Sequence, residues 1–71
     1  MIRRIFALNL TIAMSRAGVS EKRLAKELGI SQPAVSKWLN AKSLPRVGTF
    51  YQICKILNSS PNELLGWHES D

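Results

Sequence analysis

Apolar residues recur at spacings of three and four along most of this 71-residue chain, which is the period of an amphipathic helix. No stretch alternates apolar and polar residues as a half-buried strand does. Turn-forming residues divide the chain into five segments, with breaks at Gly18, Gly29, residues 41–45 and residues 59–61. The pattern predicts an all-α fold of five short helices, and the length predicts one compact unit without a separate catalytic or ligand-binding lobe.

A first helix is predicted from about residue 3 to residue 17, ended by Gly18 in the left-handed conformation. One face is expected to join the core, formed by Phe6, Leu10, Ala13, Met14 and Ala17. A second apolar stripe of Ile5, Leu8 and Ile12 lies away from that face. Either neighbouring helices enclose this stripe, or it helps to form a homodimer together with Leu65 and Trp67, because exposed apolar stripes usually mark interfaces.

Two short helices are predicted next, separated by a tight turn. Ser20 is a good N-cap for the first of them, which Gly29 ends. Ser31 is expected to cap the second, over residues 32–40, where Pro33 is tolerated because first-turn amides lack helical partners. The residues of this helix separate into an apolar side, with Ala34, Val35, Trp38 and Leu39, and a polar side, with Gln32, Pro33, Ser36, Lys37 and Asn40. The apolar side is expected to pack, leaving the polar side free.

A fourth helix is predicted over residues 47–57, and a short fifth helix begins after Ser60 as its N-cap, with Pro61 in its first position. The apolar residues expected to point inward are Val47, Phe50, Ile53, Cys54 and Leu57 in the fourth helix and Leu64 and Leu65 in the fifth. The folded domain is predicted to cover residues 1–66, with residues 67–71 as a flexible tail.

The formal charge of +5 is unevenly distributed. Residues 1–58 hold all ten Lys and Arg residues, with only Glu21 and Glu27 as acidic counterparts. Such a basic body suits a polyanionic partner, because neutralised phosphates release counterions. A basic surface that is only solvated is the alternative, and charge alone does not separate the two.

Other classes of function find little support in the composition. Cys54 is the only cysteine, so neither an internal disulfide nor a thiolate zinc cluster can form, which fits a reducing cytoplasm. Arg3 and Arg4 before an apolar run resemble a signal peptide, but Asn9 and Thr11 interrupt that run. His68 has no matching ligands for a metal, and no catalytic arrangement is visible. We therefore expect no enzyme, cofactor, metal, small-molecule ligand or membrane partner.

The segment from Ser20 to Asn40, SEKRLAKELGISQPAVSKWLN, has the features of two helices that cross steeply through a tight turn. It resembles the Cro and lambda-type repressor family of phage and bacterial regulators. The similarity continues through the Pro45 loop, TFYQICKILN and SPNELL. The resemblance implies a compact five-helix bundle with a helix-turn-helix, whose third helix enters the major groove of operator DNA in a bacterial cytoplasm.

By the same resemblance, four residues are expected to meet base edges: Gln32, Pro33, Ser36 and Lys37. Gln pairs with adenine, Lys with guanine, and an apolar group with the thymine methyl. The backbone of DNA is expected to contact Asn40, Lys42, Ser43 and Arg46, which would position the protein rather than specify sequence. The protein would then be a sequence-specific transcriptional regulator that binds double-stranded DNA, as a homodimer on a pseudo-palindromic operator.

The chain departs from the family's common pattern at several positions. Glu21 stands where the family commonly has a phosphate-binding Gln, so Lys22 or Ser20 is expected to take that contact. Met14 and Leu39 replace a common Arg–Glu pair, an exchange that is often neutral or stabilising. Arg46 replaces a frequent capping Ser. Two alternatives stay open: the polar side of the third helix is an ordinary wetted face, or the fold serves as a protein-interaction module such as an antitoxin.

Overall fold

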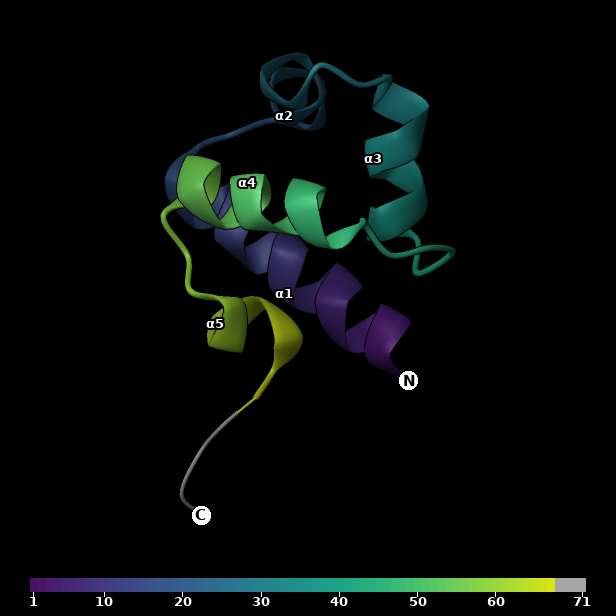
Figure 1. Ribbon diagram of the computed structural model, residues 1–71, viewed down its shortest axis with the longest axis vertical. Helices are drawn as coiled ribbons and strands as arrows, with labels where there is room; N and C mark the ends of the chain where they lie inside the picture. The colour runs from purple at the N-terminus through teal and green to yellow at the C-terminus, as the bar shows by residue number, and fades with distance from the viewer. Residues whose placement is uncertain (68–71) are drawn as a thin grey trace.

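Five helices account for most of residues 1–67, the part of the chain that the computed structural model describes, and no strand occurs among them. They are α1 (Ile2–Ala17), α2 (Glu21–Leu28), α3 (Gln32–Leu39), α4 (Val47–Leu57) and α5 (Pro61–Leu65). The predicted number and order of helices are confirmed. In Figure 1, α4 crosses in front of α1, α2 lies at one end of the bundle, and α3 forms one edge.

The core lies where α1 meets the other helices, since α1 packs against α3, α4 and α5. Its largest fully buried side chains come from all five helices: Phe6, Leu10, Leu24, Val35, Ile53 and Leu64. The rings of Phe6 and Phe50 lie 5.9 Å apart in a tilted arrangement, which links α1 to α4. Met14 is buried and Leu39 packs against the core, so both positions of the replaced ion pair are apolar contacts of the core.

Three residues expected to point inward are exposed instead, and one of them is Leu65, the last residue of α5, which is 38% exposed. Ala17, the last residue of α1, is exposed beside the turn at Gly18. Val47 is 84% exposed, whereas the buried residues of α4 begin only at Ile53. All three follow the helical period, but each lies in a terminal turn and is exposed there. Periodicity gives the direction of a side chain and cannot say whether anything is packed there.

The end of α5 is held tightly against α1. Gly66 has a φ of 67°, and a Cβ added there would lie 2.7 Å from Cγ2 of Ile5. This approach covers part of Ile5, which is half-buried, so one member of the predicted apolar stripe is enclosed. Leu8 and Ile12 are 63% and 42% exposed. The stripe is therefore divided between the fold and the solvent.

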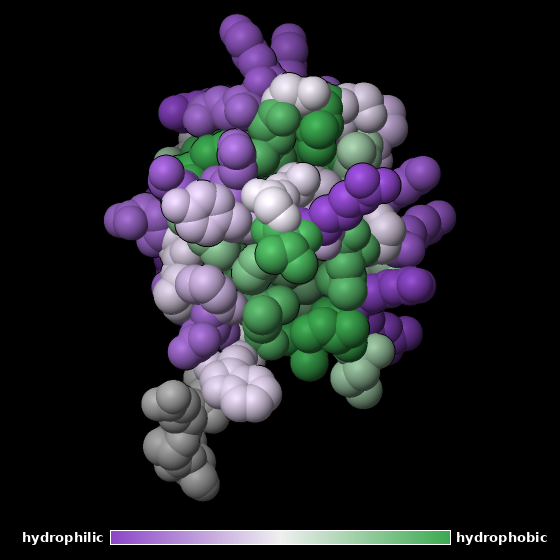
Figure 2. Space-filling view, viewed as in Figure 1, coloured by the Kyte–Doolittle hydropathy of each residue, from purple (hydrophilic) through white to green (hydrophobic). Residues whose placement is uncertain are grey.

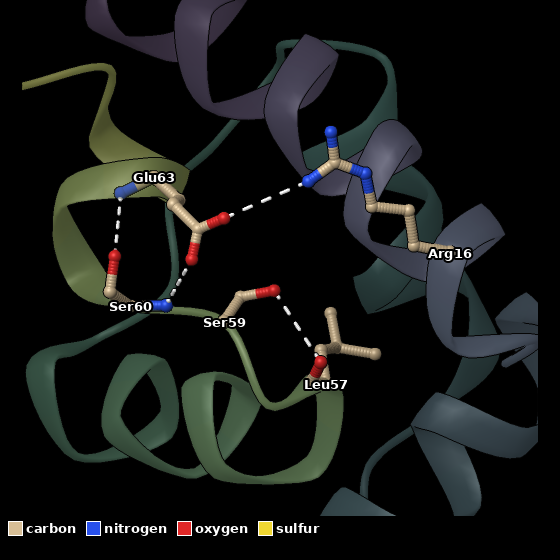
Figure 3. Close-up of polar contacts among 5 residues, drawn as sticks. All are labelled: Arg16, Leu57, Ser59, Ser60 and Glu63. Carbon is tan, nitrogen blue, oxygen red and sulfur yellow. Dashed lines mark hydrogen bonds and ion pairs between the residues drawn. The ribbon is translucent and has the colours of Figure 1, made fainter.

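A capping box begins α5, as Figure 3 shows. The Ser60 hydroxyl accepts from the Glu63 amide at 3.1 Å, and the Ser60 amide donates to Oε1 of Glu63 at 2.9 Å. Oε2 of Glu63 also lies 3.7 Å from Nη1 of Arg16 on α1. The bond from the Ser60 amide, helped by the Ser60 hydroxyl and the Arg16 charge, holds the pKa of Glu63 below its ordinary value. The same carboxylate thus caps α5 and ties it to α1.

Past α5, the Trp67 amide donates to the carbonyl oxygen of Asn62 at 2.9 Å, and the Trp67 side chain is 66% exposed. The rest of the predicted tail, including His68, lies outside the described residues. No helix within residues 1–67 is long and apolar enough to cross a membrane.

Candidate nucleic-acid interface

The turn between α2 and α3 is built by Gly29. Its φ of 70° is a conformation that residues with a Cβ rarely adopt, and its amide and that of Ile30 donate to carbonyl oxygens of the last turn of α2. The Ser20 hydroxyl accepts from the Arg23 amide at 3.1 Å at the other end of α2, which confirms Ser20 as the N-cap. Both ends of α2 are therefore fixed by local bonds.

Apolar side chains hold α3 across α2 and α1. Val35 is fully buried and Trp38 is 6% exposed, in contact with a core that includes Leu24 and Ala25 of α2. Leu28 and Ile30 pack against the edge of the same core. Trp38 is thus a core residue, as expected. The anchoring face of α3 leaves its opposite face pointing out of the bundle (Figure 1).

The outward face carries the four residues predicted to meet bases. Gln32, Pro33 and Lys37 are exposed, and Ser36 is half-buried. Pro33, Ser36 and Lys37 line a shallow open hollow of about 410 Å³ together with Asn40 and Lys42. The predicted division of α3 into a packed side and an outward side is confirmed.

The start of α3 differs from the prediction in one respect. Ser31 occupies the N-cap position with extended backbone, but its side chain accepts no capping hydrogen bond. Pro33 has no amide to donate, and the Ala34 amide donates to the carbonyl oxygen of Ser31 at 3.1 Å. No amide of the first turn is thus left in position for the Ser31 hydroxyl.

At its other end, α3 stops one residue earlier than predicted, and Asn40 is its C-cap. Ala41 then takes a φ of 59°, a region that glycine adopts at lower cost, and the Lys42 amide donates to the carbonyl oxygen of Lys37 at 2.8 Å. This turn brings Lys42 back beside Lys37. The sequence offered no sign of it, because alanine does not mark a left-handed position.

Most of the residues predicted to contact the DNA backbone are accessible. Ser20, Lys22, Asn40, Lys42 and Arg46 are exposed, and Ser43 is half-buried. Arg46 is the N-cap of α4 without a capping side-chain bond, as its replacement of Ser suggested. Lys42 and Arg46 come from one loop and lie at the two ends of the link between α3 and α4.

No acidic residue within residues 1–67 neutralises the positive charges near α3. Among residues 1–67, the ion pairs are Arg16 with Glu63 and Arg23 with Glu27, the second at 2.7 Å. Lys22, Lys37, Lys42 and Arg46 take part in neither pair. Their positive charge is available to an anionic partner, and exposed pairs such as the other two contribute little to stability.

The described residues meet the requirements of neither a metal site nor a reactive thiol. No group of three or more His, Cys, Asp and Glu residues is placed to hold a metal ion within residues 1–67. Cys54 is buried, and burial raises the pKa of its thiol, which keeps the less reactive protonated form. Cys54 therefore acts as a small apolar residue of the core.

Comparison with known proteins agrees with this geometry. A family model described as helix-turn-helix matches residues 3–64. The chain is 29% identical to the 26 kDa repressor protein of Escherichia phage HK022 over 97% of its own length, and it spans 31% of that relative. No solved structure gives a significant match. With α2, the Gly29 turn and α3 as its helix-turn-helix, the chain belongs to the DNA-binding helix-turn-helix family of the Cro and lambda-repressor type.

Proposed function

We propose that this protein is a sequence-specific transcriptional regulator that occupies operator DNA, with α3 in the major groove. The observation that carries the proposal is the outward face of α3, where Gln32 and Lys37 are exposed and Ser36 is half-buried while Val35 and Trp38 anchor the helix. A helix presenting an amide, a hydroxyl and an ammonium group has the donors and acceptors that distinguish base pairs in that groove.

The proposed roles divide the face into two groups. Gln32, Pro33, Ser36 and Lys37 would read base edges, and each good bidentate contact would contribute about 1 to 3 kcal/mol of discrimination. Lys42 and Arg46, with Lys22, Ser20 and Ser43, would contact phosphates and fix the register of the helix. The repressor named in the comparison supports a role in regulation, although the present chain matches only part of that protein.

Binding to random duplex DNA, measured against salt concentration, tests whether these cations meet phosphates. We expect affinity to fall steeply with salt, and Lys42→Ala to reduce the slope of log K against log salt by about one. Lys55→Ala is the matched control, because Lys55 lies on α4 over the ring of Tyr51, 5.4 Å from its centroid. An affinity that does not change with salt, or a slope that Lys42→Ala and Lys55→Ala reduce equally, would contradict the assignment and favour a protein-interaction module.

We further propose that the operator is pseudo-palindromic and is bound by a homodimer. Besides Leu8 and Ile12, the protein exposes an apolar surface on α4 and α5 that the sequence pattern had assigned to the core. Figure 2 shows apolar side chains gathered on this face, with polar ones around its margin. Its hollow of about 200 Å³ is lined by Phe6, Leu44, Pro45, Val47, Phe50 and Leu65.

This second surface supports the homodimer better than the stripe on α1. Val47 is 84% exposed and lines the hollow, so one apolar surface carries both an accessible side chain and a recess that the same surface of a second copy could cover. Leu65 and Trp67, predicted interface residues, are also exposed at its α5 side. Leu44 lies in the link that follows α3, so the contact would set the spacing of the two recognition helices.

Sedimentation of two charge variants separates the surfaces. Val47→Glu should convert a dimer to a monomer, whereas Leu8→Glu should leave it intact. Both residues are exposed, so neither change should unfold the chain. Loss of the dimer in Leu8→Glu alone would assign the interface to α1, and a wild-type monomer bound to a single half-site would refute the homodimer.

A further inference from the structure

The side-chain nitrogen of Asn40 bonds twice to one residue of α3. Its Nδ2 donates to the carbonyl oxygen of Ser36 at 2.8 Å and to Oγ of Ser36 at 3.3 Å. The carbonyl oxygen can only accept, so the NH₂ half of the amide must face Ser36 and the amide orientation is fixed. In this arrangement the side-chain nitrogen of Asn40 is turned toward Ser36.

The bond to Oγ restricts the hydroxyl of Ser36. A serine hydroxyl has one proton and two lone pairs, and Asn40 occupies one lone pair. The proton must point away from the NH₂ group that faces it. Within residues 1–67 the Ser36 hydroxyl donates to no protein acceptor. Since Ser36 lines the hollow on the outward face of α3, the proton is available to a partner in that hollow.

We propose that Asn40 is a positioning residue: it occupies one of the two lone pairs of the Ser36 hydroxyl, which favours Ser36 as a hydrogen-bond donor toward the base that it meets, since a hydroxyl that accepts a bond donates more strongly. This inference rests on the proposed function, in which α3 reads base edges, and it replaces the phosphate contact that the family resemblance implies for Asn40. A donor in the major groove can bond to guanine, thymine or adenine, which all present acceptors. Cytosine presents only its N4 amino group and is disfavoured at the contacted base.

Selection of binding sites from random duplexes, carried out on matched variants, tests the polarity of Ser36. Ser36→Ala identifies the contacted position, where the wild type should select against cytosine by about threefold to tenfold, the worth of one neutral hydrogen bond. Asn40→Asp replaces the two donors by a carboxylate that only accepts. The Ser36 proton would turn toward the carboxylate, its lone pairs would face the DNA, and cytosine would become as good as or better than the wild-type base.

Two further variants isolate the effect of Asn40 on Ser36. Asn40→Ala frees the hydroxyl to rotate, so discrimination against cytosine should weaken toward that of Ser36→Ala, and this result decides the matter if Asn40→Asp does not fold. The double variant Ser36→Ala with Asn40→Asp should match Ser36→Ala at the contacted position. The added negative charge lowers affinity for every sequence, so relative base preference is the quantity compared.

The outcomes distinguish this inference from the proposed function. A clear wild-type motif in which the Asn40 variants lose affinity without any change in base preference would overturn the role of Asn40 alone. The same holds if Ser36→Ala alters no position, or if the wild type prefers cytosine there. Recovery of random sequences by the wild type would overturn the proposed function and, with it, this inference.

Discussion

The α3 side and the α4–α5 side of the bundle differ in how far their apolar residues are buried. On α3 the apolar residues Val35 and Trp38 are buried and polar residues face outward, whereas the α4–α5 side leaves Val47, Tyr51 and Leu65 exposed. Cations outside the two ion pairs of residues 1–67, and an open hollow lined mainly by polar residues, accompany the first surface. A hollow lined by apolar residues accompanies the second. The α3 side is therefore suited to a hydrated, charged partner and the α4–α5 side to an apolar one.

The largest expected contrast is in stability. Trp38→Ala should lower the free energy of unfolding by about 3 to 5 kcal/mol, because it opens a cavity under α3. Val47→Ala should change it by less than about 0.5 kcal/mol, since 84% of Val47 is exposed. Urea denaturation followed by circular dichroism measures both. A similar loss in the two variants would remove the distinction between the anchored and the exposed side.

Base preference should separate two lysines that line the same hollow on the α3 side. Lys37→Ala should relax the preference at one position, at a cost of about 1 to 3 kcal/mol for the best sequence. Lys42→Ala should weaken every sequence alike, because a phosphate contact carries no sequence information. Competition binding with single-base variants of a selected site is the measurement. Parallel losses in both variants would mean that Lys37 also contacts only the backbone.

Ala41 after α3 and Gly66 after α5 both have a positive φ, and exchanging alanine and glycine at the two positions should change stability in opposite directions. Gly66→Ala should destabilise the protein by about 1 to 2 kcal/mol or more, from the positive φ and from the added contact with Ile5. Ala41→Gly should stabilise it by about 0.5 to 1 kcal/mol, because relief of the backbone exceeds the entropic cost of glycine. Thermal unfolding of the two variants should shift in opposite directions, and a shift in the same direction would show that φ at these positions matters little.

The smallest effect concerns pH. The folded pKa of Glu63 is lowered, so its contribution is present above the unfolded pKa of about 4.3. It is lost as the pH falls through the folded value. Glu63→Gln keeps the capping geometry without the charge, and it should therefore remove part of the acid dependence of stability. Identical pH profiles for wild type and Glu63→Gln would exclude Glu63 as a source of that dependence.

Local patterns in the sequence predicted much of the fold. Ser20, Gly29 and Ser60 act at helix ends as their residue types suggest, and the polar side of α3 faces outward. Val47 was misassigned because its exposure depends on which helices lie nearby. The Ser31 side chain accepts no capping bond, since the Ala34 amide donates to the Ser31 carbonyl oxygen instead, and the left-handed Ala41 lacks a sequence signal.

For the candidate site, residue type and spacing identified the outward face, but they could not reveal how its side chains bond to one another. The pair of bonds from Asn40 to Ser36 depends on where α3 ends, which the pattern placed one residue late. Helix ends are the least certain part of such predictions. Both the bonds of Asn40 to Ser36 and the position of Lys42 beside Lys37 depend on where α3 ends.

The most direct test of the account is to follow backbone amide resonances while duplex DNA is added to the isotopically labelled protein. The largest shifts should fall on Gln32, Ser36, Lys37 and Lys42, with amides of the α4–α5 apolar surface such as Leu65 changing little at constant oligomeric state. Shifts concentrated on α4 and α5, with α3 unaffected at saturating DNA, would contradict the assignment of α3 as the helix that enters the groove.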